Sequence, residues 1–253
     1  MRDGKIVTNK LGKQFRRYRA HRPRTFQQAV AGGLRLLSPV ERVWILRDIS
    51  FTVPQGKMIG VIGTNGAGKS TLLRMIAGVM RADEGSGEVH GRLGALLEIG
   101  AGFHPDLTGR ENVFVAGIVG GLTRREVAQR FDSVVEFSEM EDAIDNPLHT
   151  YSSGMRMRLG FSLSIHLDPD VILIDEILAV GDFAFAHKCL NCILEFKKQG
   201  CAILIATHDL EVCRQYCDGL LWLDGARLAG SGLPGQVIDK YLESMNLAEP
   251  ARA

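Results

Sequence analysis

One glycine-rich stretch constrains this chain more than any other feature. Gly63–Thr71 has the sequence GTNGAGKST and fits the pattern G-x-x-x-x-G-K-[ST] of a phosphate-binding loop. A short apolar run, Lys57–Ile62, precedes it, and apolar residues recur at helical spacing over Leu72–Ala77. We therefore predict a buried strand, a tight turn and a helix that begins at Lys69.

A strand, a glycine-rich turn and a helix N-terminus together form an anion site. Glycines let backbone N–H groups approach phosphate oxygens, and the helix start adds about half a positive charge. In this pattern Lys69 reaches the β- and γ-phosphates of a nucleotide, and the Ser70 hydroxyl is a ligand for Mg²⁺. We expect ATP and Mg²⁺ to bind here. The residues expected to contact the nucleotide are Gly63, Thr64, Asn65, Gly66, Ala67, Gly68, Lys69, Ser70 and Thr71.

Length and composition fit one large α/β domain, or one domain with a subdomain inserted. The 253 residues carry a formal net charge of +1, so overall charge favours no particular partner. No apolar run approaches the ~20 residues needed to cross a bilayer. The N-terminus also lacks the apolar core of a signal peptide. We expect the chain to remain in the cytoplasm.

Two further apolar runs end in polar residues that suit phosphate chemistry. Asp175 and Glu176 directly follow the run Val171–Ile174, and His208 follows Ile203–Thr207. Ligands of open parallel sheets bind at the carboxyl ends of the strands, so these side chains should meet in one crevice. We expect Asp175 to hold Mg²⁺ and Glu176 to act as general base or to orient water. A lone histidine is usually structural, but here we expect His208 to contact the γ-phosphate or Glu176.

A second anion site is predicted at Tyr151–Met155, which opens a helix. Its start offers a serine hydroxyl and free backbone N–H groups, with Ser152, Ser153 and Gly154 as the expected contacts. The chain therefore has one phosphate loop and one helix start of this second kind.

The cysteines and the N-terminus are less informative. The spacings C-x2-C and C-x3-C are compatible with a zinc site, but small buried residues on helices explain them better. The cysteines are Cys189, Cys192, Cys201, Cys213 and Cys217.

Residues 1–24 carry nine Lys/Arg against one acid, which suits a solvated arm or strand edge, or attraction to anionic lipids or a phosphate-bearing substrate. Residues 26–37 have apolar residues at helical spacing and would pack on the domain or meet a membrane protein or bilayer.

The other segments of the sequence predict both strands and helices. A capping box at Thr123–Glu126 opens a helix within a largely helical region, residues 100–165. The apolar runs at 171–174 and 202–206 suit parallel strands that are covered on both faces. The other predicted elements are strands at 44–46 with 49–53 and at 58–62, a hairpin at 220–228 and a last helix at 235–245.

The order of these motifs resembles the ATP-binding subunits of ABC transporters over about residues 5–245. The resemblance implies an α/β P-loop NTPase (RecA-like) core with a mostly parallel sheet. It also implies an N-terminal antiparallel β subdomain (residues 1–56, with an insertion at 19–42) and an inserted α-helical subdomain (100–165). In this family two copies pair head-to-tail, so each ATP lies between one phosphate loop and the signature of the other copy. The signature here is Tyr151–Met155.

Departures from the usual family motifs indicate a branch. The signature is Tyr-Ser-Ser-Gly-Met in place of Leu-Ser-Gly-Gly-Gln, and residues 177–182 are Ile-Leu-Ala-Val-Gly-Asp. Glu98 stands where the family usually has a glutamine. With Leu107–Asn112 and the insertion at 19–42, these features are similar to bacterial exporters of O-antigen, capsule and teichoic acid.

The resemblance implies an ATPase at the cytoplasmic face of the bacterial inner membrane, bound to an integral membrane permease. The transported substrate would be a polysaccharide or lipid-linked glycan, and no nucleic acid is expected as a partner. Glu98 would join Ser70 and Asp175 near Mg²⁺, and Asp182 would contact nucleotide. Phe15 or Tyr18 would stack on adenine, with Phe15 favoured.

Three further expectations follow from the resemblance. The permease contact surface should include residues 98–112 and 26–37, and no carbohydrate-binding domain is expected after the nucleotide domain. An importer subunit would carry a glutamine at position 98 and the common signature Leu-Ser-Gly-Gly-Gln. A soluble ABC ATPase of ribosomes or DNA would carry a second nucleotide domain or long coiled coils, and neither pattern occurs in this sequence.

Overall fold

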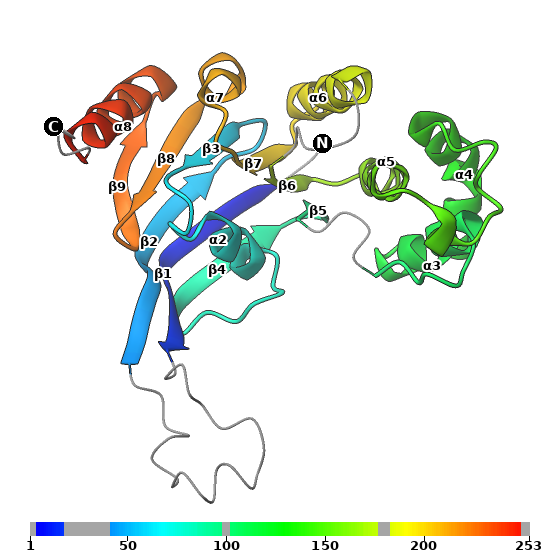
Figure 1. The fold of residues 1–253 in the computed structure, drawn as a ribbon, viewed down its shortest axis with the longest axis horizontal. Helices are drawn as coiled ribbons and strands as arrows, with labels where there is room; N and C mark the ends of the chain where they lie inside the picture. The colour runs from blue at the N-terminus through cyan, green and yellow to red at the C-terminus, as the bar shows by residue number, and fades with distance from the viewer. Residues whose placement is uncertain (1–3, 18–40, 98–101, 177–182, 249–253) are drawn as a thin grey trace, which may run out of the picture.

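The computed structural model describes residues 4–17, 41–97, 102–176 and 183–248 (Figure 1). Within them the chain forms a six-stranded sheet, a three-stranded sheet and a group of helices at one side. Tyr18, Glu98, Asp182 and the segment 26–37 lie outside the described residues, so the predictions about them stay predictions.

The six-stranded sheet carries the predicted site. Its strand order is β5-β6-β7-β3-β8-β9, and neighbours are parallel from β5 to β8, whereas β9 is antiparallel to β8. The predicted runs at 58–62, 171–174 and 202–206 are confirmed as strands. The bounds are β5 Leu93–Leu96, β6 Val171–Asp175, β7 Ala202–Ala206, β3 Met58–Ile62, β8 Gly219–Asp224 and β9 Arg227–Gly232.

Both faces of this sheet are buried, which explains why its central strands are uninterrupted apolar runs. In β6, Ile172 and Ile174 pack toward the helices on one face, whereas Val171 and Leu173 pack toward the other. The first face is covered by α5 Ser153–His166, α6 Phe183–Lys198, α7 Leu210–Tyr216 and α8 Pro234–Ala248. The second face is covered by α2 Lys69–Ile76 and the three-stranded sheet.

The three-stranded sheet has the order β2-β1-β4 and is antiparallel. Its strands are β1 Lys5–Arg17, β2 Glu41–Val53 and β4 Glu84–His90. The two strands expected at 44–46 and 49–53 are one strand, β2, which contains a left-handed residue at Asp48 (φ 59°). The expectation of an arm or strand edge at the N-terminus is wrong for residues 5–12, because there β1 is paired with β2 on one side and β4 on the other, whereas residues 13–17 pair with β2 alone. Ile6 and Leu11 are fully buried and anchor it despite its many cations.

Residues 102–165 are mostly helical, as predicted for this region, and have their own apolar core. Thr123 and Glu126 form the predicted capping box, and Thr108 with Glu111 forms a second one. In the view of Figure 1, this helical subdomain lies at the opposite end from α8. Its elements are α3 Gly109–Val119, α4 Arg124–Ser138, the 3₁₀ turn η2 Leu148–Thr150 and α5.

The cysteines are free thiols in the packed interior. Four are buried and Cys192 is half-buried, which confirms the interpretation as small core residues. Burial raises the pKa of Cys189 to about 12 and that of Cys192 to about 11. In the described segments, no helix has the length and apolar character required of a membrane span.

Candidate functional site

The phosphate loop has a backbone that needs glycine at defined positions. Gly63 ends β3 with φ 150°, and a Cβ there would lie 2.4 Å from the carbonyl oxygen of Leu223. Gly68 has φ 101° and caps α2, where a Cβ would lie 2.9 Å from the Leu46 side chain. Both positions exclude a side chain by conformation and by space. The helix begins at Lys69, as predicted.

Lys69 lies at the centre of the site. Its Nζ donates hydrogen bonds to the carbonyl oxygens of Gly63 (2.7 Å) and Thr64 (3.1 Å), so the ammonium is held over the loop. Burial lowers the pKa of Lys69, while the nearby carboxylates of Glu176 and Asp175 act in the opposite direction. The lysine therefore lies close enough to both predicted carboxylates to interact with them electrostatically.

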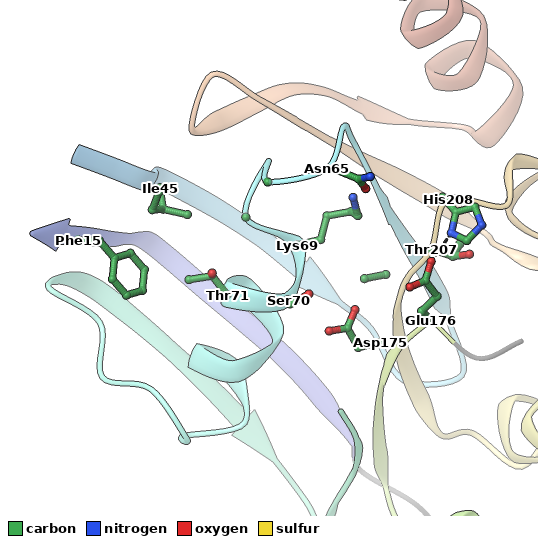
Figure 2. Close-up of a pocket in the computed structure, with 13 residues that line it drawn as sticks. Phe15, Ile45, Asn65, Lys69, Ser70, Thr71, Asp175, Glu176, Thr207 and His208 are labelled. Atoms are coloured by element: carbon green, nitrogen blue, oxygen red, sulfur yellow. Dashed lines mark ion pairs between the residues drawn. The ribbon is translucent and has the colours of Figure 1, made fainter. Parts of the chain in front are cut away.

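A pocket of about 420 Å³ joins the loop to the two strand ends (Figure 2). The structure thus brings together six of the nine predicted loop residues, the acidic strand end and the histidine; Gly63, Thr64 and Ala67 do not line this pocket. A pocket of this volume is in the range of small-molecule sites. It is lined by Phe15, Ile45, Asn65, Gly66, Gly68, Lys69, Ser70, Thr71, Asp175, Glu176, Ala206, Thr207 and His208.

The acidic pair and the histidine meet as the strand-end argument predicted. Asp175 ends β6, and the Glu176 backbone N–H donates to the carbonyl oxygen of Ala206 (2.9 Å), which ties it to β7. Glu176 has the left-handed φ of 60°, which is uncommon for a residue with a side chain. Its carboxylate forms an ion pair with Nδ1 of His208 (Figure 2). Strained backbone of this kind often accompanies functional sites.

The oxygen atoms in the pocket suit a hard divalent cation. The Ser70 hydroxyl and the Asp175 carboxylate both line it, and Mg²⁺ prefers such ligands together with phosphate oxygens and water. Two protein oxygens fit a magnesium ion that is shared with a nucleotide. Among the described residues, no group of three or more His, Cys, Asp or Glu forms a metal site by itself.

One end of the pocket is apolar. Phe15, 41% exposed, lines it together with Ile45, and both come from the three-stranded sheet. An exposed aromatic face at the pocket wall offers a stacking surface for a base. Figure 2 places Phe15 on the opposite side of the loop from Glu176 and His208, as a base requires when its phosphates lie over the loop.

The Tyr151–Met155 segment forms the predicted helix start but does not reach the pocket. Ser152 caps α5, and its Oγ accepts a hydrogen bond from the Met155 N–H (3.1 Å). The Tyr151 hydroxyl donates to the carbonyl oxygen of Ala143 (2.5 Å), so the segment is anchored inside the helical subdomain. Ser152 and Ser153 are exposed, and neither they nor Gly154 line the pocket. Within one chain, the two predicted anion sites are separate.

The sequence interpretation missed three lining residues. Ile45 belongs to β2, and only the packing of β2 beside the loop brings it to the pocket. Ala206 and Thr207 immediately precede His208, so the strand-end rule that selected the histidine could have found them.

Comparison with known proteins agrees with this geometry. The family model described as ABC transporter matches residues 46–179, which contain the loop, the Tyr151–Met155 helix start and the acidic pair. The chain belongs to the ABC transporter family. The resemblance predicted from the motifs is therefore confirmed.

Within this family, the chain is similar to ATP-binding proteins of O-antigen and teichoic acid export. The chain is 48% identical to the O-antigen export system ATP-binding protein RfbB of Myxococcus xanthus over 82% of its length and 48% of the relative. It is 46% identical to RfbB of Klebsiella pneumoniae over 79% of its length and 81% of the relative. With the teichoic acids export protein TagH of Lactococcus lactis, identity is 41% over 78% of this chain and 42% of the relative. The chain thus spans about half of some relatives and most of others.

Solved structures support the fold. An ATP binding subunit of an ABC transporter superposes with a TM-score of 0.74 at 22% identity, covering 96% of this chain and 98% of the other. A dimeric post-hydrolysis state of the cassette MJ0796, bound to ADP and Pi, gives 0.73 at 17% identity, covering 90% and 98%. The predicted fold class, an α/β core with an antiparallel β subdomain and helical elements, is confirmed.

Proposed function

We propose that this ABC transporter family member is an ATPase that drives export of a bacterial surface polysaccharide or lipid-linked glycan. The observation that carries the proposal is the convergence of Lys69, Asp175, Glu176 and His208 in one pocket beside the phosphate loop. The similarity to ATP-binding proteins of O-antigen and teichoic acid export supports the class of transported polymer.

The predicted residues of the pocket have roles in nucleotide binding or hydrolysis under this proposal. The loop amides and Lys69 bind the phosphates, while Ser70 and Asp175 hold Mg²⁺. Glu176 accepts a proton from the attacking water or orients it, and the ion pair with His208 keeps its carboxylate directed to the pocket. Phe15 stacks on adenine. The ion that Ser70 and Asp175 would hold would supply positive charge to offset that of the phosphates.

We further propose that the working unit is a head-to-tail homodimer. Ser152, Ser153 and Gly154 present hydroxyls and helix N–H groups to solvent, away from the pocket of their own chain. An isologous two-fold arrangement would bring each helix start over the pocket of the other copy and create two equal composite sites. ATP would then join the two copies because both contact its phosphates.

The helical subdomain offers a surface for the membrane permease. On α3, Val115, Ile118 and Val119 are 46%, 47% and 83% exposed. The first two line a mostly apolar hollow of about 540 Å³, with Arg110 and Arg124 at its edge. An apolar surface with a charged edge is suited to a short amphipathic segment of a partner. Binding there would hold the ATPase at the cytoplasmic face of the inner membrane.

Two measurements test this proposal: co-purification of the chain with a membrane protein, and the amount of polymer on the cell surface. A tagged chain in its native host is expected to co-purify from detergent extracts with one integral membrane protein and to restore surface polymer to a deletion strain. Ile118→Asp with Val119→Asp should lose both, because a charge in the apolar contact is costly. Leu233→Asp, at a residue that is 61% exposed and lies between β9 and α8, is the matched control. A double variant that keeps the partner and the polymer contradicts the proposed surface, and full surface polymer without the chain contradicts the export function.

A further inference from the structure

Three helices each contribute one phenylalanine to a shared aromatic cluster. Phe137 lies in α4, Phe161 in α5 and Phe185 in α6. Ring centroids are 6.0 Å apart for Phe137 and Phe161, 5.9 Å for Phe137 and Phe185, and 6.3 Å for Phe161 and Phe185. These spacings are those of favourable aromatic pairs. The cluster thus joins two helices of the helical subdomain to a helix that packs on the six-stranded sheet.

Two cations and a carboxylate cover the rim of this cluster. The Arg158 guanidinium lies 4.7 Å from the ring centroid of Phe185, and the Lys188 ammonium lies 4.6 Å from that of Phe137. Glu139 accepts hydrogen bonds from both cations, from Arg158 Nη1 at 2.5 Å and from Lys188 Nζ at 3.3 Å. We name this set the aromatic clasp. It consists of Phe137, Glu139, Arg158, Phe161, Phe185 and Lys188.

The backbone of Glu139 indicates that its position is specific. Glu139 caps the C-terminus of α4 in the left-handed region, with φ 58° and ψ 44°. Glycine is the usual residue at such a cap because a side chain is disfavoured in this conformation. The glutamate places one carboxylate between a cation of α5 and a cation of α6, which glycine could not do.

The clasp connects the two parts of the chain that the proposed mechanism uses. Helix α5 begins directly after Ser152, and α6 begins at Phe183, a few residues beyond Glu176 along the chain. Packed rings and two charged hydrogen bonds thus link α5 to α6.

We infer that Glu139 is a positioning residue that sets the angle of α5 relative to the core. In that orientation Ser152–Gly154 of one copy meets the nucleotide on the loop of a second copy. The inference rests on the dimer proposed above. It adds that dimer closure depends on a carboxylate that touches neither nucleotide nor metal. Loss of the carboxylate should loosen α5 and weaken ATP-driven pairing, while the pocket that first binds ATP is unchanged.

The test measures dimerisation and ATP binding separately, in a Glu176→Gln background that slows hydrolysis. Sedimentation velocity with MgATP gives the dimer dissociation constant, and a fluorescent ATP analogue at low protein concentration gives the affinity of the monomer. Glu139→Gln should weaken the dimer roughly 5- to 10-fold, at the lower end of typical coupling between sites, with monomer affinity unchanged. Glu139→Asp keeps the charge and should recover part of the loss.

The matched control is Glu195→Gln, which removes an ion pair to Lys198 (2.6 Å) on the exposed side of the same helix α6. It should leave the dimer constant unchanged. Lys188→Gln leaves the left-handed cap intact and should weaken the dimer in the same direction, so the test does not depend on the folding of one variant. Equal dimerisation of Glu139→Gln and its parent overturns the clasp inference. Failure of the parent itself to dimerise with MgATP overturns the proposed dimer and, with it, this inference.

Discussion

Replacement of Glu176 by glutamine separates catalysis from binding and from stability in this site. The glutamine keeps the size of the side chain and still accepts a hydrogen bond, but it cannot take a proton from water. General-base groups contribute about 10²–10⁴-fold to a rate. Such a loss corresponds to about 2.7–5.4 kcal/mol of barrier height.

The effect on folding should be much smaller. The ion pair between Glu176 and His208 has side chains that are 55% and 76% exposed, so solvent screens it. Exposed pairs contribute at most about 1 kcal/mol. For a chain of this size, such a change lowers the melting temperature by about 2–4 °C. A loss of turnover with a nearly unchanged melting temperature therefore assigns the effect to chemistry.

Single-turnover phosphate release is the assay, with ATP affinity measured in parallel by a fluorescent analogue. The variant should release phosphate at least about a hundredfold more slowly. Its ATP affinity should remain within about threefold, because the amides and Lys69 bind the phosphates. Asp209→Asn removes a nearby carboxylate that caps α7 and is the control for local disturbance. Turnover of Glu176→Gln within tenfold of the parent chain would refute the role assigned to Glu176.

Three other outcomes are expected. Lys69→Ala should weaken ATP binding itself by about 10- to 150-fold, the range for loss of a charged hydrogen bond, and an unchanged affinity would contradict the phosphate contact. Phe15→Ala should weaken ATP binding by about 5- to 150-fold through lost stacking but leave ribose triphosphate, which has no base, unaffected; equal loss for both ligands would exclude stacking. Cys189 has a pKa of about 12, against an ordinary value of 9.0. Its thiolate fraction therefore rises with pH but is still only about one part in a thousand at pH 9. Iodoacetamide should modify it slowly in the native chain and rapidly in denaturant, and rapid native labelling would show that the thiol is accessible.

Several parts of the fold were predictable because local chemistry determines them. The loop at Gly63–Thr71 needs glycine at fixed places, and residues 171–174 of β6 and all of β7 are apolar because both of their faces are covered. Capping at Thr123 depends only on residues within one helical turn. Such signals require no knowledge of distant contacts, so the sequence is sufficient for them.

Other elements were missed because their signal is not local. Strand β4, Glu84–His90, is polar and mostly exposed, and it forms through pairing with β1. The cations of β1 suggested an arm or strand edge, whereas Ile6 and Leu11 hold it at the centre of a sheet. Propensity is weak evidence in strands because the partners on either side decide their stability.

The sequence by itself determined that this chain has a phosphate loop, a separate helix start at Ser153 and carboxylates at a strand end. Those features depend on backbone conformation and on short apolar runs, which neighbouring residues encode. Only the tertiary structure decided that Phe15 and Ile45 face the same pocket as Glu176, and that Glu139 lies between cations of two helices. These contacts join residues far apart in the chain. Their geometry follows from the packing of whole elements, which no single stretch of sequence specifies.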